Sequence, residues 1–141
     1  MTQVSGSIVI QNSLAPVYVV TFTGKVSDQE FRAHLAALSA IIERPGSRAL
    51  VYDARLAQPA PASQRQLQAE WMKGNDAAIR RATAGIAFVV PSAIVRGALT
   101  AILWLQPLAC PHRVTANFED GFRWARQQLA AAKPVGRALS R

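Results

Sequence analysis

The residues ALVYD at positions 49–53 and GIAFVV at positions 85–90 decide the fold. Both runs are short and almost wholly apolar, which is typical of strands that are buried on both faces of a parallel sheet. The segment between them has helical spacing, with Leu67, Trp71 and Ile79 directed inward. A strand, a helix and a second buried strand form the unit from which parallel sheets are built. The sequence therefore predicts an α/β domain.

The helix between these two strands follows a proline-rich loop over residues 55–62. Ser63 is expected to be its N-cap, because a serine at that position can accept a hydrogen bond from the first turn. Gly74 and Asn75 are residues that bend or break helices. The sequence leaves open whether one helix continues through them.

Two strands and a helix are predicted before this unit. Residues 7–10 and 17–22 are rich in β-branched and aromatic side chains, and the turn residues between them predict an antiparallel hairpin. Ser27 and Glu30 then form a capping box. The apolar side of the helix that follows consists of Phe31, Leu35, Leu38 and Ile42.

The C-terminal part repeats the alternation of helix and strand. Ser92 begins a helix that runs to Leu105, residues 112–116 form a weaker strand, and Asn117 caps a last helix. The predicted order is β-β-α-β-α-β-α-β-α. This order favours a mostly parallel sheet of about five strands with four helices on its two faces, the first strand being antiparallel at the edge.

The domain is expected to span residues 1–133, and residues 134–141 are expected to form a basic, flexible tail. No internal repeat and no change in composition divides the chain, so a single domain is predicted.

Composition limits the classes of partner. The formal net charge is +8, but the arginines, Arg48 among them, are spread along the chain, so no sequence-specific nucleic-acid partner is expected. The first residues lack the pattern of a secretory signal, and no apolar run approaches the ~18–20 residues of a membrane span. We therefore expect a cytoplasmic protein without membrane insertion.

The element order, the residues VYD at 51–53 and Trp71 in the next helix resemble the STAS domain family, specifically the SpoIIAA-like proteins of bacteria. The residues FEDGFRW at 118–124 are similar to the ending of that group, where a helix begins near an acidic pair and carries a tryptophan. The resemblance implies a STAS-like α/β domain that acts as a non-enzymatic regulatory or protein-interaction module.

One functional position of the family differs here. In the anti-sigma-factor antagonists that the chain resembles, a serine just past the acid ending the third strand is phosphorylated by a partner kinase. In this sequence Asp53 is followed by Ala54 and Arg55, and the first hydroxyl is that of Ser63. The sequence therefore argues against the phosphorylation switch.

A polar site is predicted where the loops after the parallel strands gather at one edge of the sheet. The residues expected there are Lys25, Asp53, Arg55, Arg65, Ser92 and Arg96. They would bind a partner protein or a small anion. The alternative is that Asp53 pairs with a nearby arginine and only stabilises a loop.

The sequence offers few groups for catalysis or metal binding, since its histidines and cysteine are His34, Cys110 and His112. His34 lies one step off the apolar side of its helix and is expected at a boundary or exposed position. Cys110 is expected to be buried beside the start of a strand. We therefore expect no catalytic residue, no metal and no cofactor.

Residues 94–105 are apolar over a wider arc than the ~100° that a helix needs to lie on a sheet. The surplus must be covered by a neighbouring helix, a ligand or another subunit. We predict a homodimer in which Leu99, Leu103 and Trp104 make the contact. The alternative function is binding of a small amphiphile or lipid against this helix.

Overall fold

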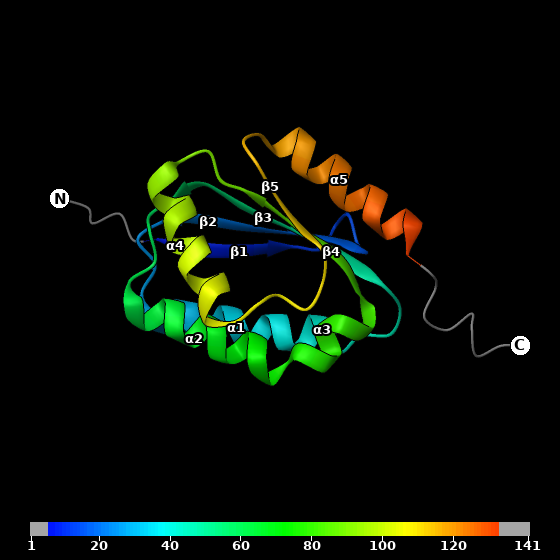
Figure 1. Cartoon of the computed structure of the whole chain (residues 1–141), viewed down its shortest axis with the longest axis horizontal. Helices are drawn as coiled ribbons and strands as arrows, with labels where there is room; N and C mark the ends of the chain where they lie inside the picture. Colours follow the sequence, from blue (N-terminus) through cyan, green and yellow to red (C-terminus); the bar gives the residue numbers. More distant parts are fainter. Residues whose placement is uncertain (1–5, 133–141) are drawn as a thin grey trace, which may run out of the picture.

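In the computed structural model, which describes residues 6–132, five strands form one mixed sheet with helices on both faces (Figure 1). The strands are β1 (Ser7–Gln11), β2 (Val17–Gly24), β3 (Arg48–Ala57), β4 (Thr83–Val89) and β5 (His112–Thr115). They follow one another across the sheet in chain order, with β1 antiparallel to β2 and every other pair parallel. The predicted fold class and the antiparallel edge strand are confirmed. The predicted tail at residues 134–141 lies outside the described residues.

Residues 6–132 form five helices, where four were predicted. They are α1 (Asp28–Ile42), α2 (Ala62–Gly74), α3 (Asp76–Ala82), α4 (Ala93–Leu105) and α5 (Phe118–Ala131). The extra helix arises because the predicted second helix breaks at Asn75, which leaves the helical conformation with φ −113° and ψ 16°. The Asn75 side-chain amide donates a 2.9 Å hydrogen bond to the carbonyl of Trp71, so the break also satisfies an end of α2.

The helix caps agree with the sequence at three of four positions. Ser27, Ser92 and Asn117 each accept a hydrogen bond from the backbone N–H three residues later. The prediction that Ser63 caps α2 is wrong. The helix begins at Ala62 directly after Pro61, whose ring presets the backbone, and no side chain caps it.

The two faces of the sheet are covered differently. Parallel strands in chain order, joined by right-handed crossovers, place every crossover helix on the same face. Side chains of α1, α2 and α4 accordingly join one apolar cluster, which contains Val20, Leu38 and Leu50. On the opposite face α5 packs alone over β3, β4 and β5 (Figure 1). The face that carries the crossover helices is called the crossover face below.

The α5 face is packed closely because glycines allow the helix to approach the sheet. A Cβ atom on Gly121 of α5 would lie 3.0 Å from a side-chain carbon of Val89 and from the hydroxyl of Thr115. A Cβ atom on Gly85 would lie 3.0 Å from the ring of Trp124. Contacts this short leave no space between α5 and the sheet.

Arg48 is buried at the start of β3, with 2% of its surface exposed. Its guanidinium donates hydrogen bonds to the carbonyl of Ile42, the last residue of α1, and to those of Arg44 and Gly46, which follow the helix. A cation is favourable at a helix C-terminus, where the helix dipole is negative. Arg48, one of the arginines dispersed along the sequence, joins α1 to β3 in the structure.

We predict that Arg48→Met lowers the free energy of unfolding by about 2–4 kcal/mol, because the three carbonyls lose their common donor in a buried position. Arg32→Met is the matched control, since Arg32 is exposed on α1 and its loss should cost less than about 0.5 kcal/mol. Urea unfolding of both variants measures the difference. Equal stability of the two variants would contradict the structural role of Arg48.

Candidate functional site

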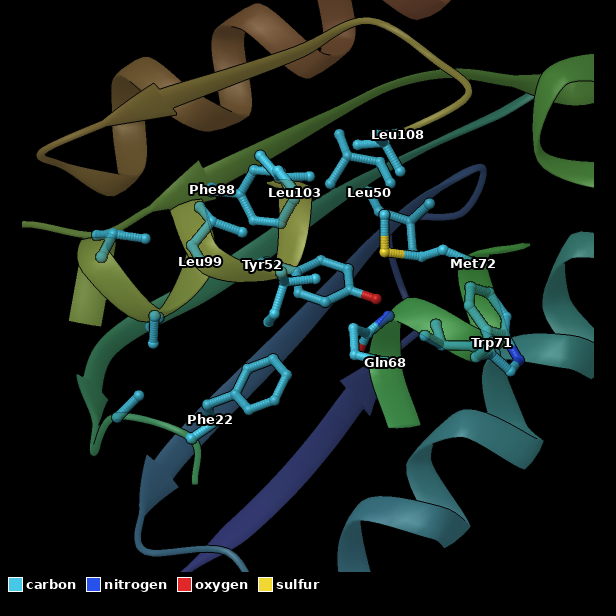
Figure 2. A pocket seen from close by; sticks show the side chains of 18 of the residues that line it. Phe22, Leu50, Tyr52, Gln68, Trp71, Met72, Phe88, Leu99, Leu103 and Leu108 are labelled. Atoms are coloured by element: carbon cyan, nitrogen blue, oxygen red, sulfur yellow. The ribbon is translucent and has the colours of Figure 1, made fainter. Parts of the chain in front are cut away.

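An apolar cavity of about 130 Å³ lies on the crossover face, between the sheet and the helices (Figure 2). Strands β2, β3 and β4 provide one side of it, and α1, α2, α3 and α4 provide the rest. Residues that represent these elements are Phe22, Leu50, Phe88, Trp71, Leu99 and Leu103. We call it the α4 cavity, because Val95, Leu99 and Leu103 of α4 are among the residues that line it.

The α4 cavity exists because α4 does not seal against the sheet. No residue of α4 is buried, whereas six residues of α1 are. Helix α4 packs mainly against α2, and only its Val95 and Leu99 side chains reach the apolar cluster of the crossover face. The apolar residues of α4 therefore face a space rather than a close-packed core.

The volume suits a small ligand. An engineered apolar cavity of about 150 Å³ in another protein stays dry and binds benzene. Typical sites for drug-sized molecules measure roughly 300–1,000 Å³. At about 130 Å³ the α4 cavity can hold an apolar group of roughly six carbon atoms.

Tyr52 of β3 carries a hydroxyl inside the α4 cavity (Figure 2). Its ring packs between Phe22 and Phe88, with centroid distances of 5.6 and 5.4 Å. Burial, and to a smaller extent the neighbouring thiol of Cys110, raises the pKa of Tyr52 far above its usual value. The phenol is therefore neutral at physiological pH and keeps its proton for a hydrogen bond.

The outer face of α4 is apolar and exposed. Ile94, Trp104 and Leu105 have exposed fractions of 73%, 86% and 53%. Of the three residues predicted for self-association, Trp104 lies on this face, but Leu99 and Leu103 line the α4 cavity (Figure 2). The structure directs the side chain of Leu103 to the interior.

Asp53 and Arg55 are the only pair among the six predicted partner or anion residues that the structure, over residues 6–132, joins by a hydrogen bond. Two nitrogens of the Arg55 guanidinium donate to the two oxygens of Asp53, at 2.9 and 2.8 Å. Burial alone would raise the pKa of Asp53, but the hydrogen bonds and charge of Arg55 hold it below its usual value. Arg55 also stacks on Phe118, so this pair faces α5.

The other four predicted residues make separate local contacts. Arg65 donates to the carbonyl of Ala60, and Arg96 donates to the carbonyl of Val90. Ser92 caps α4, and Lys25 lines a small hollow beside the loop that follows β3. These contacts hold the loops at the carboxyl edge of the sheet. Binding of a partner or an anion by the six residues stays a prediction.

No family model matches the sequence, and no curated protein is significantly similar to it. The structure is similar to that of an uncharacterised protein of the DUF3478 family from Shewanella loihica PV-4, which has a SpoIIAA-like fold. The similarity covers 89% of this chain and 98% of the other, with a TM-score of 0.63 and 11% sequence identity. The chain has a SpoIIAA-like fold. The resemblance drawn from the sequence is thereby confirmed at the level of fold.

The chain has few reactive groups near the α4 cavity. Cys110 packs against the cluster of the crossover face, and burial raises the pKa of its thiol to about 12. A thiol with so high a pKa is a poor nucleophile. Within residues 6–132 no three metal-binding side chains gather, and no described helix has the length and apolar content to cross a membrane.

A partial signal for the α4 cavity was present in the sequence. The wide apolar arc of residues 94–105 indicated that something must cover it, and a ligand was one of the alternatives. The roles of Tyr52 and Gln68 were missed, because one lies in an apolar strand and the other in a polar stretch of α2. Only the packing of α2 and α4 over β3 brings them to one cavity (Figure 2).

His34 is buried behind the wall of the α4 cavity, with 4% of its surface exposed, so its predicted boundary or exposed position is wrong. It lies three residues after Phe31 and four before Leu38, which is within the buried side of α1. The rings of Phe22, Phe31 and Tyr52 surround it at centroid distances of 5.3–6.1 Å. Neither ring nitrogen has a hydrogen-bond partner among the described residues, and burial lowers its pKa to about 4.

We predict that the free energy of unfolding falls as the pH is lowered from about 6.5 to about 4. Between these pH values His34 binds a proton in the unfolded state but not in the folded state. The free energy of unfolding therefore falls by roughly 3 kcal/mol over this range. Urea unfolding between pH 4 and 8 measures this slope. The contribution of His34 to the pH dependence of the free energy of unfolding should vanish in His34→Phe. It should remain in the control His112→Phe, because His112 is exposed. An unchanged slope in His34→Phe would show that His34 is not the cause.

Proposed function

We propose that this chain is a cytoplasmic, non-enzymatic regulatory module that binds a small amphiphile in the α4 cavity. The observation that carries the proposal is the cavity itself, an apolar space of about 130 Å³ under a helix without a single buried residue. A ligand there would remove the inner face of α4 from water. Burial of apolar surface contributes about 25 cal/mol for each Å².

The surroundings of the cavity favour binding over catalysis. The side chains around it are mainly aliphatic and aromatic, and none of the lining residues is charged. A catalytic site needs a nucleophile beside a base or a group that shifts protons near neutral pH. The neighbouring thiol of Cys110, with its pKa of about 12, and the tyrosine hydroxyl of Tyr52 both stay protonated at that pH.

We predict that a ligand of suitable size stabilises the protein. At a concentration ten times its dissociation constant, 1-hexanol should add about 1.4 kcal/mol to the free energy of unfolding, which corresponds to a rise in melting temperature of roughly 3–6 °C. Leu103→Trp fills the cavity and should remove this shift, whereas Thr100→Val, on the exposed side of α4, should keep it. Circular dichroism establishes that both variants fold.

The proposed function is wrong if 1-hexanol stabilises Leu103→Trp as much as the unaltered protein. The melting temperature of each protein is compared with and without 1-hexanol, so the intrinsic stability of the variant does not affect the result.

A second function, contact with another copy of the chain, is supported by the outer face of α4. Ile94 in the first turn of α4, and Trp104 and Leu105 in its last turn, have exposed fractions of 73%, 86% and 53%. Large exposed aromatic residues dominate the energetics of many interfaces. This face does not include Leu99 and Leu103, so a dimer contact would use Trp104 together with the exposed Leu105 and Ile94.

We predict that Trp104→Glu weakens self-association at least tenfold, because a charge replaces the largest apolar side chain of the contact. Leu14→Glu is the control, since Leu14 is an exposed leucine in the turn between β1 and β2. Size-exclusion chromatography with light scattering gives the dimer fraction at high micromolar concentration. A monomeric unaltered protein, or a Trp104→Glu variant that dimerises normally, would refute the contact.

A further inference from the structure

The α4 cavity contains a small number of polar groups in an apolar surrounding. Its lining includes the polar side chains of Tyr52, Gln58, Gln68 and Thr83. Trp71 also lines it, but its indole nitrogen already donates a 2.8 Å hydrogen bond to the hydroxyl of Ser39. Gln58 is exposed at the end of β3, and Thr83 lies at the start of β4. Tyr52 and Gln68 lie between these ends, on opposite sides of the cavity.

Tyr52 and Gln68 direct their polar ends into the same part of the cavity (Figure 2). The hydroxyl of Tyr52 comes from the sheet, and the amide of Gln68 comes from α2. Within residues 6–132 neither group forms a hydrogen bond to another protein group. Both are therefore able to bind a polar atom placed between the sheet and α2.

The neighbours of Gln68 show that this lack of a partner is particular to the cavity. Gln64 donates to the carbonyl of Val26 and to Asp28, and Gln66 donates to Glu70. Both of these glutamines face protein or solvent outside the cavity. Gln68 is the glutamine of α2 that lines it.

A polar group in an apolar surrounding loses free energy unless it gains a hydrogen bond. A ligand that carries one hydrogen-bonding atom would satisfy Tyr52 and Gln68 together, since the hydroxyl donates and the amide both donates and accepts. A purely apolar ligand would exclude water from both groups without replacing its hydrogen bonds. Such sites discriminate strongly against ligands that lack the polar group.

The ligand's polar group must also be uncharged. The lining residues include no Lys, Arg, His, Asp or Glu, so an ion in the cavity would have no opposite charge to compensate its lost hydration. Arg65, near the start of α2, and Arg96, near the start of α4, already donate to the carbonyls of Ala60 and Val90. These contacts direct the two guanidinium groups to the backbone that precedes their helices.

We propose that the α4 cavity is specific for a neutral amphiphile, a short apolar chain with one hydroxyl, amide or carbonyl group that hydrogen-bonds to Tyr52 and Gln68. This inference rests on the proposed function of the same cavity. It names the class of ligand: alcohols, primary amides or ketones rather than carboxylates, amines or plain hydrocarbons.

A series of six-carbon probes tests the head group at constant chain length. Binding of n-hexane, 1-hexanol, hexanamide, hexanoate and hexylammonium to the full chain is measured by NMR titration at pH 7. We expect 1-hexanol and hexanamide to bind roughly tenfold or more tighter than hexanoate and hexylammonium. Equal or tighter binding of hexanoate would overturn the proposal and would indicate a cation at the mouth of the cavity.

Two variants test the residues. Tyr52→Phe and Gln68→Leu should each weaken binding of 1-hexanol roughly five- to tenfold and leave binding of n-hexane unchanged or tighter. Gln66→Leu, an exposed position of the same helix, should change neither. Unchanged affinity for 1-hexanol in both cavity variants would overturn the role of Tyr52 and Gln68.

The failures of the two proposals are distinguishable. If none of the five probes binds, the amphiphile function itself is wrong, and the specificity proposal fails with it. If n-hexane binds as tightly as 1-hexanol, the cavity function stands and the neutral head-group specificity is wrong.

Discussion

The order of the strands is the constraint on which the rest of this structure depends. Four parallel strands follow one another across the sheet in chain order, so right-handed connections place all their helices on one face. Five strands spaced by ~4.8 Å give a sheet about 24 Å wide, and packed helices lie 8–10 Å apart, so about two helices fit side by side. Helix α1 and the α2–α3 pair occupy that width. Helix α4 is the surplus helix, and it packs on α2 with no buried residue of its own.

On the opposite face of the sheet a single helix, α5, packs against the strands. There α5 lies close to the strands, because Gly85 and Gly121 remove the Cβ atoms that would hold it away. Close packing on one face and an unfilled cavity on the other therefore follow from one topology. The cavity lies where the chain has more helix than the sheet can cover, which is a place where a ligand can add contacts without displacing any protein group.

The regular parts of this fold could be predicted from the sequence because they depend on local patterns. The apolar runs ALVYD and GIAFVV, the capping serine at position 27 and the hairpin residues each act within a few neighbours. The burial of Arg48 and His34 could not be predicted from the sequence. Arg48 is buried only because α1 and β3 come together in the fold. His34 is buried because the buried side of α1 is one residue wider than the sequence pattern indicates. The same holds for Tyr52 and Gln68, which are separated by fifteen residues and a loop and meet only through tertiary packing. The sequence predicted the wide apolar arc of α4. It could not predict which apolar residues face the sheet, since only the structure shows that Leu103 points inward and Trp104 outward.

Intermolecular nuclear Overhauser effects between 1-hexanol and methyl-labelled leucines test most directly whether the ligand lies between the sheet and α4. Leu50 belongs to the sheet side of the cavity and Leu103 to the α4 side, while Leu56 and Leu105 are exposed elsewhere. We predict that bound 1-hexanol gives nuclear Overhauser effects to Leu50 and Leu103 together and none to Leu56 and Leu105. Effects confined to Leu105, or absent from Leu50, would place the ligand on the surface of α4 and contradict the account.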